Sequence, residues 1–461
     1  MSGANRTATA SSFRDPDGFV FLENGIIYRQ VNSSYKVNYD FLIHSGLYKS
    51  LVEKNLLISH EEYSGSSKVN AAGVYKVLLP QQIPFISYPH EWSFGQLKDA
   101  AILTIQIQQI AFEHGMSLKD ASAYNVQFLE GKPVFIDTLS FEKYNEGAPW
   151  NAFGQFCRHF LAPLALRKYT DGSLGQLSRI YMDGIPLNLA SKLLPFKTYF
   201  NFNLLSNIHL HARSERHFSD KKSELVKRKV SKNALRGIFT FMESFISALD
   251  WKPQGTQWSN YYSETNYSDN SRNQKKEIVS DYLEKAKPKA VLDLGANDGT
   301  FSRIASSKGI FTISADNDFA AVEKNYRKLK EDQEINIFPI WMDLSNPTSS
   351  FGWNYSERAS FNDRVHGGLV MMLALIHHLV ISNNLPFQNV IEFLLPVCDW
   401  VIIEFVPKSD SQVQWMLQGR EDVFHHYTID NFEKEFSRFF QIHEKKKIEG
   451  TERVIFLMKK R

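Results

Sequence analysis

The chain has 461 residues, more than one ordinary hydrophobic core serves, so its length predicts two or three domains. Hydrophobic residues make up 43% of the chain and charged residues 22%, a balance that excludes global disorder. The formal net charge is only +3, which gives no general attraction to nucleic acid or to an anionic membrane. We therefore expect no membrane partner.

The cysteine content and the apolar runs indicate the compartment. Cys157 and Cys398 are the two cysteines of the sequence, too few for a disulfide framework or a cysteine-based zinc site. The polar N-terminal residues lack the apolar core of a signal peptide. The most apolar run, residues 367–381, is interrupted by two histidines and is too short to span a bilayer comfortably. These features predict a soluble cytoplasmic protein.

The first half of the chain predicts an α+β domain over residues 16–215. Residues 1–15 are polar and are expected to form a disordered leader. Residues 19–31 alternate apolar and polar side chains around an Asn-Gly dipeptide, which predicts a tight hairpin. Apolar residues recur at helical spacing over 93–114, and residues 126–137 are typical of strand, turn and strand.

A basic stretch separates the two halves of the chain, and the pattern of predicted elements changes after it. Residues 216–257 predict a basic helical connector with a solvated charged face. From Lys287 onward, predicted strands alternate with helices, a pattern that favours a parallel sheet with right-handed crossovers. The tail predicts helix, strand, turn and strand. We assign residues 258–461 to this second domain.

One loop of the second domain carries the strongest functional signal. A buried strand ends near Asp293, and Gly295, Asn297 and Gly299 follow in a turn that leads into a helix. Glycines let the backbone approach a ligand, and amides at a helix start favour a carboxylate. The aspartate can attract an ammonium group. These are the requirements for binding the amino-acid end of S-adenosylmethionine.

The next two strands also end in acidic residues. Asp316 closes a strand about twenty residues beyond the turn, where a carboxylate can accept both ribose hydroxyls. Asp343 closes the following strand and is placed to accept from the adenine amino group. Gly295 and Gly299 are four residues apart, unlike the dinucleotide fingerprint. The alternatives are an NAD site, or acids that merely end strands.

These motifs resemble those of class I S-adenosylmethionine-dependent methyltransferases over residues 258–461. Residues 376–379, 402–424 and 427–440 are more closely similar to a bacterial nodulation-protein-type subgroup. The resemblance implies a Rossmann-like sheet of seven strands, closed by an antiparallel hairpin. It also implies roles for six residues: Asp293, Gly295, Asn297 and Gly299 at the methionine end, Asp316 at the ribose and Asp343 at the adenine. Asn297 stands where the family often has a second glycine.

Methyl transfer needs little from side chains, because the sulfonium is already an activated donor. A hydroxyl acceptor is helped by a base, and His377, His378 and Glu404 follow the fourth and fifth strands. We predict His377 and Glu404 as catalytic residues, with packing or helix capping as the alternative for the histidine. The expected acceptor is a small molecule or a glycan. Protein or RNA comes second, because no basic face with interleaved aromatics is evident.

The first domain contains a second constellation. Asp120, Asn125 and Asp137 follow the order of a kinase catalytic loop and its second metal-binding aspartate. The segment resembles the C-lobe of protein-kinase-like and aminoglycoside-phosphotransferase-like folds. If that site is active, the resemblance implies Asp120 as base, and Asn125 and Asp137 as metal ligands for Mg-ATP. Lys119 and the Thr-Leu pair after Asp137 depart from the kinase pattern, and no glycine-rich loop precedes residue 100. The alternative is an accessory domain.

Three functions therefore remain open at the level of sequence. The leading one is an S-adenosylmethionine-dependent methyltransferase with an unidentified acceptor. The second is a bifunctional protein whose first domain binds ATP. The third is a non-catalytic regulatory protein that binds S-adenosylmethionine. The sequence does not identify the methylated atom or the oligomeric state.

Overall fold

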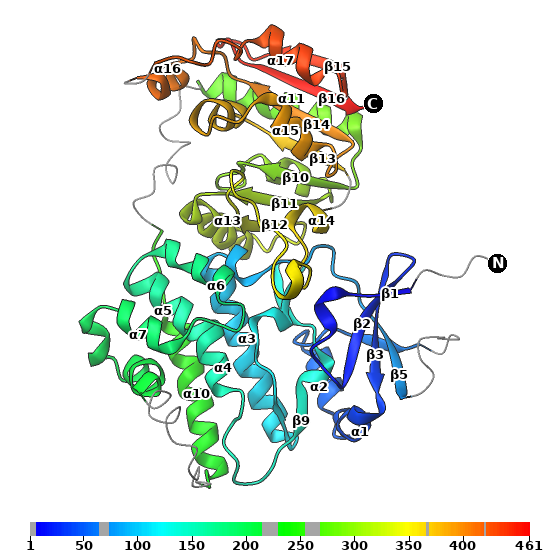
Figure 1. The fold of residues 1–461 in the computed structure, drawn as a ribbon, viewed down its shortest axis with the longest axis vertical. Coiled ribbons are helices and arrows are strands. Elements are labelled where there is room, and N and C mark those ends of the chain that lie inside the picture. The colour runs from blue at the N-terminus through cyan, green and yellow to red at the C-terminus, as the bar shows by residue number, and fades with distance from the viewer. Residues whose placement is uncertain (1–5, 64–72, 214–228, 254–267, 366–367, 419–420) are drawn as a thin grey trace, which may run out of the picture. The chain divides into compact units, whose positions relative to one another are not determined.

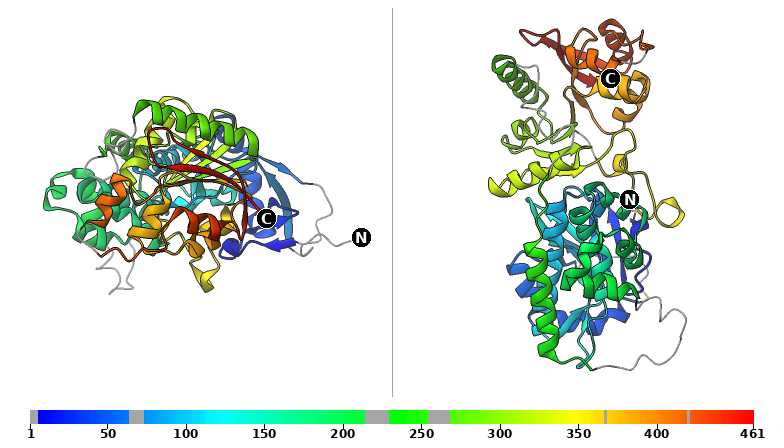
Figure 2. Two further views of the ribbon diagram at one scale, coloured as in Figure 1. Left: turned by 90° about the horizontal axis from the view of Figure 1, so that it is seen from above. Right: turned by 90° about the vertical axis from the view of Figure 1, so that its left-hand side faces the viewer.

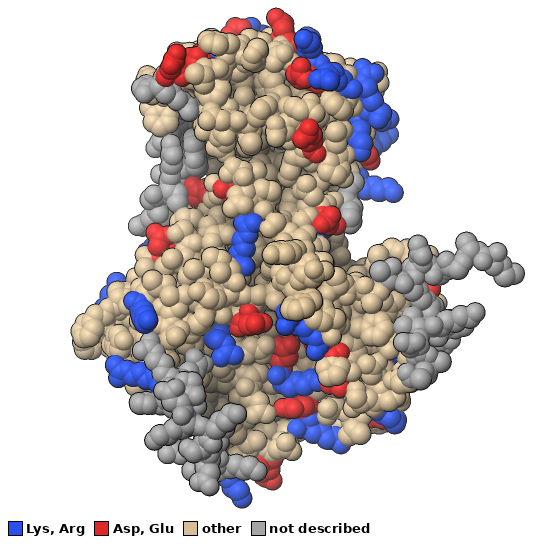
Figure 3. All heavy atoms as spheres, viewed as in Figure 1, with Lys and Arg blue, Asp and Glu red and all other residues tan. Residues whose placement is uncertain are grey.

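The computed structural model describes residues 6–63, 73–213, 229–253, 268–365, 368–418 and 421–461. The chain forms two compact units. Unit 1 comprises residues 1–252 and 350–359, and unit 2 comprises residues 253–349 and 360–461. The ribbon is coloured along the chain in Figures 1 and 2. Acidic and basic side chains are interspersed over much of the face in Figure 3, as a small net charge predicts.

Unit 1 contains a five-stranded sheet in the order β1-β2-β3-β5-β4. The predicted hairpin is confirmed, because β2 and β3 pair antiparallel around Asn24 and Gly25, whose φ angles are 53° and 79°. Positive φ at both central residues is what a tight two-residue turn requires. The strands are β1 Arg6–Ala8, β2 Gly18–Glu23, β3 Ile26–Asn32, β4 His60–Glu62 and β5 Val74–Pro80.

The expected disordered leader is wrong in part. Residues 6–8 form β1, which pairs antiparallel with β2 in the register Arg6↔Glu23, and a 3-10 turn at Ala10–Ser12 follows. A strand of three residues is too short to show an alternating pattern. It is recruited by the open edge of β2, which supplies backbone partners that the local sequence does not reveal.

The rest of unit 1 is mainly helical and lies beside this sheet in Figure 1, which confirms the α+β class expected for the first domain. The predicted long helix is confirmed as α3, Phe94–Glu113, capped by the Ser93 side chain, which accepts from the Gln96 amide. Its other regular elements are α1 Lys36–His44, α2 Leu47–Glu53, β6 Met116–Leu118, β7 Val126–Leu129, β8 Lys132–Phe135, β9 Phe141–Lys143, α4 Phe153–Phe156, α5 Ala162–Tyr169, α6 Leu177–Ile180, α7 Leu187–Leu193, α8 Phe202–Leu204 and α10 Lys232–Ala248.

The basic stretch contributes a core helix to unit 1. Helix α10 buries Leu235, Phe239, Met242 and Ile246 at helical spacing, and the Phe239 ring meets that of Phe112 on α3 at 5.7 Å. The sequence led us to expect a solvated connector, because the charges dominate the pattern. Four apolar residues on one face suffice to dock the helix. The other parts of the predicted connector, 216–228 and 254–257, lie outside the described residues.

Unit 2 is built on a seven-stranded sheet in the order β12-β11-β10-β13-β14-β16-β15. Strand β16 runs antiparallel to both of its neighbours, β14 and β15, and all other neighbouring strands pair in parallel. The predicted Rossmann-like sheet with a closing hairpin is therefore confirmed. The strands are β10 Ala290–Leu294, β11 Phe311–Asp316, β12 Ile337–Trp341, β13 Leu369–Met372, β14 Trp400–Phe405, β15 Phe440–Lys447 and β16 Val454–Lys460.

Helices cover both faces of this sheet. Figures 1 and 2 show α11, α12 and α13 on one face, with α15 and α17 on the other. Buried residues of α11 and α12 pack against β10, β13, β14 and β16 in one hydrophobic cluster. The helices are α11 Asp269–Ala286, α12 Ser302–Ser306, α13 Phe319–Glu331, α14 Phe361–Arg364, α15 Phe387–Leu394, α16 Ser411–Leu417 and α17 Ile429–Phe436. Within the described residues, no helix is long and apolar enough to cross a membrane.

Candidate functional site

A cavity of about 550 Å³ opens at the carboxyl ends of the parallel strands of unit 2. It is lined by residues that follow β10, β11, β12 and β13, and by residues of α11 and α16. Strand β10 lies between β11 and β13, so the strand order reverses at this point of the sheet. Such a switch point is where open parallel sheets bind ligands.

The predicted glycine turn forms one wall of the cavity. Gly295, Asn297 and Gly299 have φ angles of 73°, 52° and 79°, so all three are in the left-handed region. A Cβ on Gly299 would lie 2.5 Å from the side-chain oxygen of Asn325, so no larger residue fits there without displacement. Asparagine tolerates this conformation better than most residues. The side chain of Asn297 accepts a hydrogen bond from the Asp298 amide at 2.9 Å.

Asp293 and Asp316 come together beside this turn. The Ser302 hydroxyl donates to Asp293 at 2.6 Å, and the amides of Asn297 and Asp318 donate to Asp316 at 2.7 and 2.8 Å. Burial raises the pKa of Asp293 to about 7 and that of Asp316 to about 6. Within the described residues, neither carboxylate forms an ion pair. Both line the cavity and are poised to accept a cationic or hydrogen-bond-donating ligand.

Asp343 lines the same cavity two residues after β12. Its side chain accepts from the Ser345 amide at 2.8 Å and from the Ser345 hydroxyl at 2.7 Å. Met342 and Leu344 beside it supply apolar surface to the cavity wall. The structure thus brings the predicted acids of three successive strands to one cavity.

The two neighbouring histidines are placed differently. His378 lines the cavity, and burial lowers its pKa to about 4, so the imidazole is neutral at neutral pH. His377 is only 2% exposed and is not among the cavity-lining residues, and its ring centroid lies 4.2 Å from that of His378. Adjacent residues in a helical turn point in directions about 100° apart, so sequence cannot decide which one faces the ligand.

Glu404, the residue before the last of β14, lies in a buried ion cluster behind the cavity wall. Its carboxylate lies 2.7 Å from the Lys275 ammonium and 3.5 Å from the Arg453 guanidinium, and Glu404 is 0% exposed. Lys275 itself lines the cavity, and burial lowers its pKa. No sequence motif marks Lys275, because it lies on α11, before the first strand of unit 2, and its partner is 129 residues away.

Other cavity residues were also missed by the sequence interpretation. They come from α11, from the starts of α12 and α13, from the segment after β13 and from α16. Trp415 is 57% exposed, so part of its ring faces solvent at the rim. The missed residues are Arg272, Lys275, Phe301, Phe319, Leu373, Leu375, Ser382, Asn383, Trp415 and Met416.

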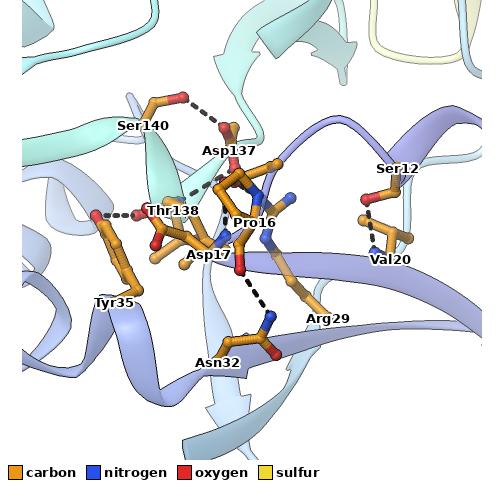
Figure 4. Close-up of polar contacts among 12 residues, drawn as sticks. Ser12, Pro16, Asp17, Val20, Arg29, Asn32, Tyr35, Asp137, Thr138 and Ser140 are labelled. Carbon is orange, nitrogen blue, oxygen red and sulfur yellow. Dashed lines mark hydrogen bonds and ion pairs between the residues drawn. The ribbon is translucent and has the colours of Figure 1, made fainter. Parts of the chain in front are cut away.

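The three kinase-like residues of unit 1 are each bonded to other residues of the chain, and Figure 4 shows the surroundings of Asp137. Arg29 on β3 extends to Asp137 at 2.6 Å, and the Ser140 hydroxyl donates to the same carboxylate. The Asn125 side chain donates to the Ser140 hydroxyl at 3.1 Å. Asp120 accepts from Gln155 at 2.7 Å and also from the Ser122 amide.

The loop between β1 and β2 adds negative charge to this cluster. Asp17 pairs with Lys119 of the catalytic-loop segment, and Asp15 lies 3.6 Å from the Arg29 guanidinium. A kinase covers the nucleotide phosphates with a glycine-rich loop and offers its aspartate to metal. Here a guanidinium faces Asp137 and two carboxylates occupy the loop. These residues do not fit Mg-ATP.

The comparisons with known proteins agree with the sequence resemblance. No family model matches the chain. The chain is 33% identical over 455 residues to nodulation protein NoeA from Rhizobium meliloti (strain 1021), covering 97% of this chain and 95% of that protein. It is similar at lower identity to two kinds of solved structure.

The bifunctional kinase-methyltransferase WbdD matches 47% of this chain and 45% of its own at 18% identity, with a TM-score of 0.30. The magnesium protoporphyrin IX methyltransferase of Synechocystis PCC 6803, solved with S-adenosylhomocysteine, matches 44% of this chain and 92% of its own at 14% identity, with a TM-score of 0.33. TM-scores of this size support no functional conclusion.

Identity over nearly the full length settles the family, while the sheet order and the acid-lined cavity settle the kind of domain. The chain belongs to the family of nodulation protein NoeA, and its unit 2 is a class I S-adenosylmethionine-dependent methyltransferase domain.

Proposed function

We propose that this enzyme methylates a hydroxyl group of a small molecule or glycan, with S-adenosylmethionine as donor. The observation that carries the proposal is the cavity of unit 2, where Asp293 is buried, Asp316 is partly buried, and neither forms an ion pair among the described residues. A ligand with a sulfonium, an ammonium group and ribose hydroxyls supplies what these carboxylates lack.

The chain's own residues would hold the donor in three places. The turn from Gly295 to Gly299 and Asp293 would take the methionine end, Asp316 the ribose, and Asp343 the adenine region. When bound, the donor supplies an activated methyl group, so the protein needs mainly to align the acceptor and exclude water.

His378 is the group of the cavity best placed to act on the acceptor. Because its imidazole is neutral, it accepts a hydrogen bond from a hydroxyl and takes the proton as that oxygen gains the methyl group. His377 and Glu404, predicted as catalytic from sequence, enter the proposal as positioning residues. His377 packs against the His378 ring, and Glu404 holds Lys275 at the cavity wall.

The rim of the cavity favours a glycan among the acceptors. Trp415 offers a partly exposed indole face, the kind of flat apolar surface on which a sugar ring packs. Ser382 and Asn383 supply hydroxyl and amide groups at the cavity, which suit the hydroxyls of a sugar. A cytoplasmic location, predicted from the sequence, belongs to the same proposal.

The test is transfer of labelled methyl groups from S-adenosylmethionine to small-molecule and glycan fractions of bacterial extract by the full chain. We expect label in a glycan fraction, lost in His378→Ala while S-adenosylhomocysteine still binds. Ser307→Ala, at the end of α12 and outside the cavity lining, serves as a control that retains transfer. If the wild type binds the cofactor but labels no fraction, the chain acts as a regulatory protein that binds S-adenosylmethionine and the proposed methyl transfer is wrong.

A further inference from the structure

Unit 1 exposes a group of large apolar side chains on α10 and on the segment before it. Phe196, Phe200 and Phe202 are 73%, 80% and 69% exposed, and Ile238 and Phe241 are 42% and 46% exposed. We name these five residues the aromatic patch. Single exposed apolar residues need no explanation, but several exposed together mark an interaction site.

Ring contacts tie the patch together. The rings of Phe196 and Phe200 meet edge to face with centroids 5.5 Å apart, and those of Phe202 and Phe241 lie 6.0 Å apart. Phe202 follows Phe200 by two residues in the chain, and Ile238 precedes Phe241 by one turn of α10. The patch therefore comprises two ring pairs, the second of which joins the segment 196–202 to α10.

The loop that presents the phenylalanines is anchored by buried polar groups. Thr198, between Phe196 and Phe200, is 1% exposed and donates to the carbonyl of Pro195 at 2.6 Å. Its hydroxyl also lies 3.0 Å from a ring nitrogen of His209, which is likewise 1% exposed. Turning the loop to bury the phenylalanines would break these contacts, so the exposure is built into the fold.

Tyr199 strengthens the same anchor. Its ring stacks on His209 with centroids 3.8 Å apart, and the other ring nitrogen of that histidine lies 2.8 Å from the Ser191 hydroxyl. Within residues 196–200, Phe196 and Phe200 therefore face solvent, while Thr198 and Tyr199 face inward and anchor the turn to His209. Rigid, outward aromatic rings lose little entropy when a partner covers them.

The charge around the patch selects the partner. Residues 184–213 contain no Asp or Glu, whereas Lys192, Lys197 and Arg213 are exposed within them. Lys232 at the start of α10 is also exposed, although it lies 3.6 Å from the Glu146 carboxylate. A second copy of the patch would bring the same cations and no acids from this segment, so self-association through it is disfavoured. The complementary surface is both apolar and anionic.

We propose that the aromatic patch docks unit 1 on the surface of an anionic lipid bilayer. Phenylalanine rings enter the interfacial layer and the lysines pair with lipid phosphates. This differs from the expectation of no membrane partner, which rested on the net charge of the whole chain. Net charge averages over all faces and does not register 30 residues that carry cations and no acids.

The test is co-sedimentation of the full chain with vesicles of phosphatidylcholine alone and vesicles enriched in phosphatidylglycerol. The wild type is expected to bind the anionic vesicles and to be released by salt. The triple variant Phe196→Ser, Phe200→Ser, Phe202→Ser should bind on the order of 100-fold more weakly, since three rings no longer leave water. Lys192→Gln with Lys197→Gln should bind about 30-fold more weakly.

The matched control changes exposed apolar residues elsewhere. Val37→Ser with Val423→Ser removes two side chains that are each 62% exposed, and it should bind as the wild type does. The far-ultraviolet circular dichroism spectrum and the urea unfolding transitions of the full chain should be the same in all variants, which verifies that they are folded. Wild-type chain that stays in the supernatant of anionic vesicles overturns the proposal. The proposal is also overturned if the triple variant still binds these vesicles. The same holds if the wild type is a dimer and the triple variant is a monomer.

Discussion

Carboxylates follow strands in both units of this protein, but their surroundings differ. Asp137 of unit 1 faces Arg29 at 2.6 Å, and Asp17 faces Lys119. In unit 2, Asp293 and Asp316 face a cavity and pair with no cation among the described residues. In unit 1, the charge of each carboxylate is balanced by a cation of the same chain. The second set is held desolvated, with raised pKa values, until a ligand arrives.

This difference shows how to separate a binding site from a structural network that uses the same residue types. A perturbed carboxyl group at a cavity stores free energy that a cationic ligand can release. A carboxylate already paired with its own chain has nothing further to gain from such a ligand. The resemblance of unit 1 to kinases lies in the order of its residues, whereas their charge partners differ.

The largest effect is expected behind the cavity, where Glu404 holds two buried cations. Glu404→Ala should lower the free energy of unfolding of unit 2 by about 3–5 kcal/mol, because Lys275 and Arg453 lose their shared counter-charge. Urea unfolding, followed through the transition that S-adenosylhomocysteine protects, measures it. Asp17→Ala in the partly exposed pair of unit 1 should leave that transition unchanged. Equal losses of unfolding free energy in Glu404→Ala and Asp17→Ala would contradict the difference between the buried ion cluster of unit 2 and the partly exposed pair of unit 1.

The next effect concerns cofactor affinity. Asp293→Asn keeps the shape of the side chain but removes the charge that attracts an ammonium group. Binding of S-adenosylmethionine should weaken by about 1.5–3 kcal/mol, the scale for hydrogen bonds to charged groups. The matched change Asp137→Asn in unit 1 should leave this affinity as it is. Calorimetric titration of S-adenosylmethionine into both variants tests this prediction. A loss of affinity in Asp137→Asn alone would contradict the assignment of the cofactor site to unit 2.

A pH dependence follows from the raised pKa of Asp293. Its carboxyl is mostly protonated below the folded pKa of about 7 and binds a cation well only when ionised. The affinity for S-adenosylmethionine should therefore rise about tenfold between about pH 6 and about pH 8. Without ligand the sign is opposite, and unit 2 should lose stability as the pH rises from about 4 towards about 7. An affinity flat across this range would argue against the ionised carboxylate as the ligand group.

The smallest expected effect is the change in melting temperature that Mg-ATP causes. Arg29 occupies the face of Asp137 that a metal would need, and Asp15 and Asp17 stand in the covering loop. Mg-ATP should leave the melting temperature of the full chain unchanged, whereas S-adenosylhomocysteine should raise it. A shift with Mg-ATP that disappears in Asp137→Ala would restore the bifunctional alternative.

Much of unit 2 could be predicted from sequence because its pattern is local. The glycine turn and the aspartates that end successive strands are each set by a few neighbouring residues, and parallel strands bring their carboxyl ends to one edge. Lys275 could not be predicted, because it meets Glu404 only after α11 packs on the sheet. The choice of His378 over His377 at the cavity depends on a helical turn whose phase the sequence does not fix.

Unit 1 was harder to predict because its features depend on pairing between distant residues. Strand β1 exists through the edge of β2, and Arg29 reaches Asp137 across more than a hundred residues. The order Asp120, Asn125 and Asp137 is local and could be recognised. Whether those side chains face metal or their own chain is decided by the loop before β2 and by β3, which carry no motif.

Calorimetric titration of S-adenosylhomocysteine into the wild-type chain and into Asp316→Ala tests the central claim most directly. We predict one binding site in the wild type and an affinity lower by about 1–3 kcal/mol in the variant, which loses the acceptor for the ribose hydroxyls. A wild type that binds no S-adenosylhomocysteine, or a variant that binds it equally well, would contradict a nucleoside site in this cavity.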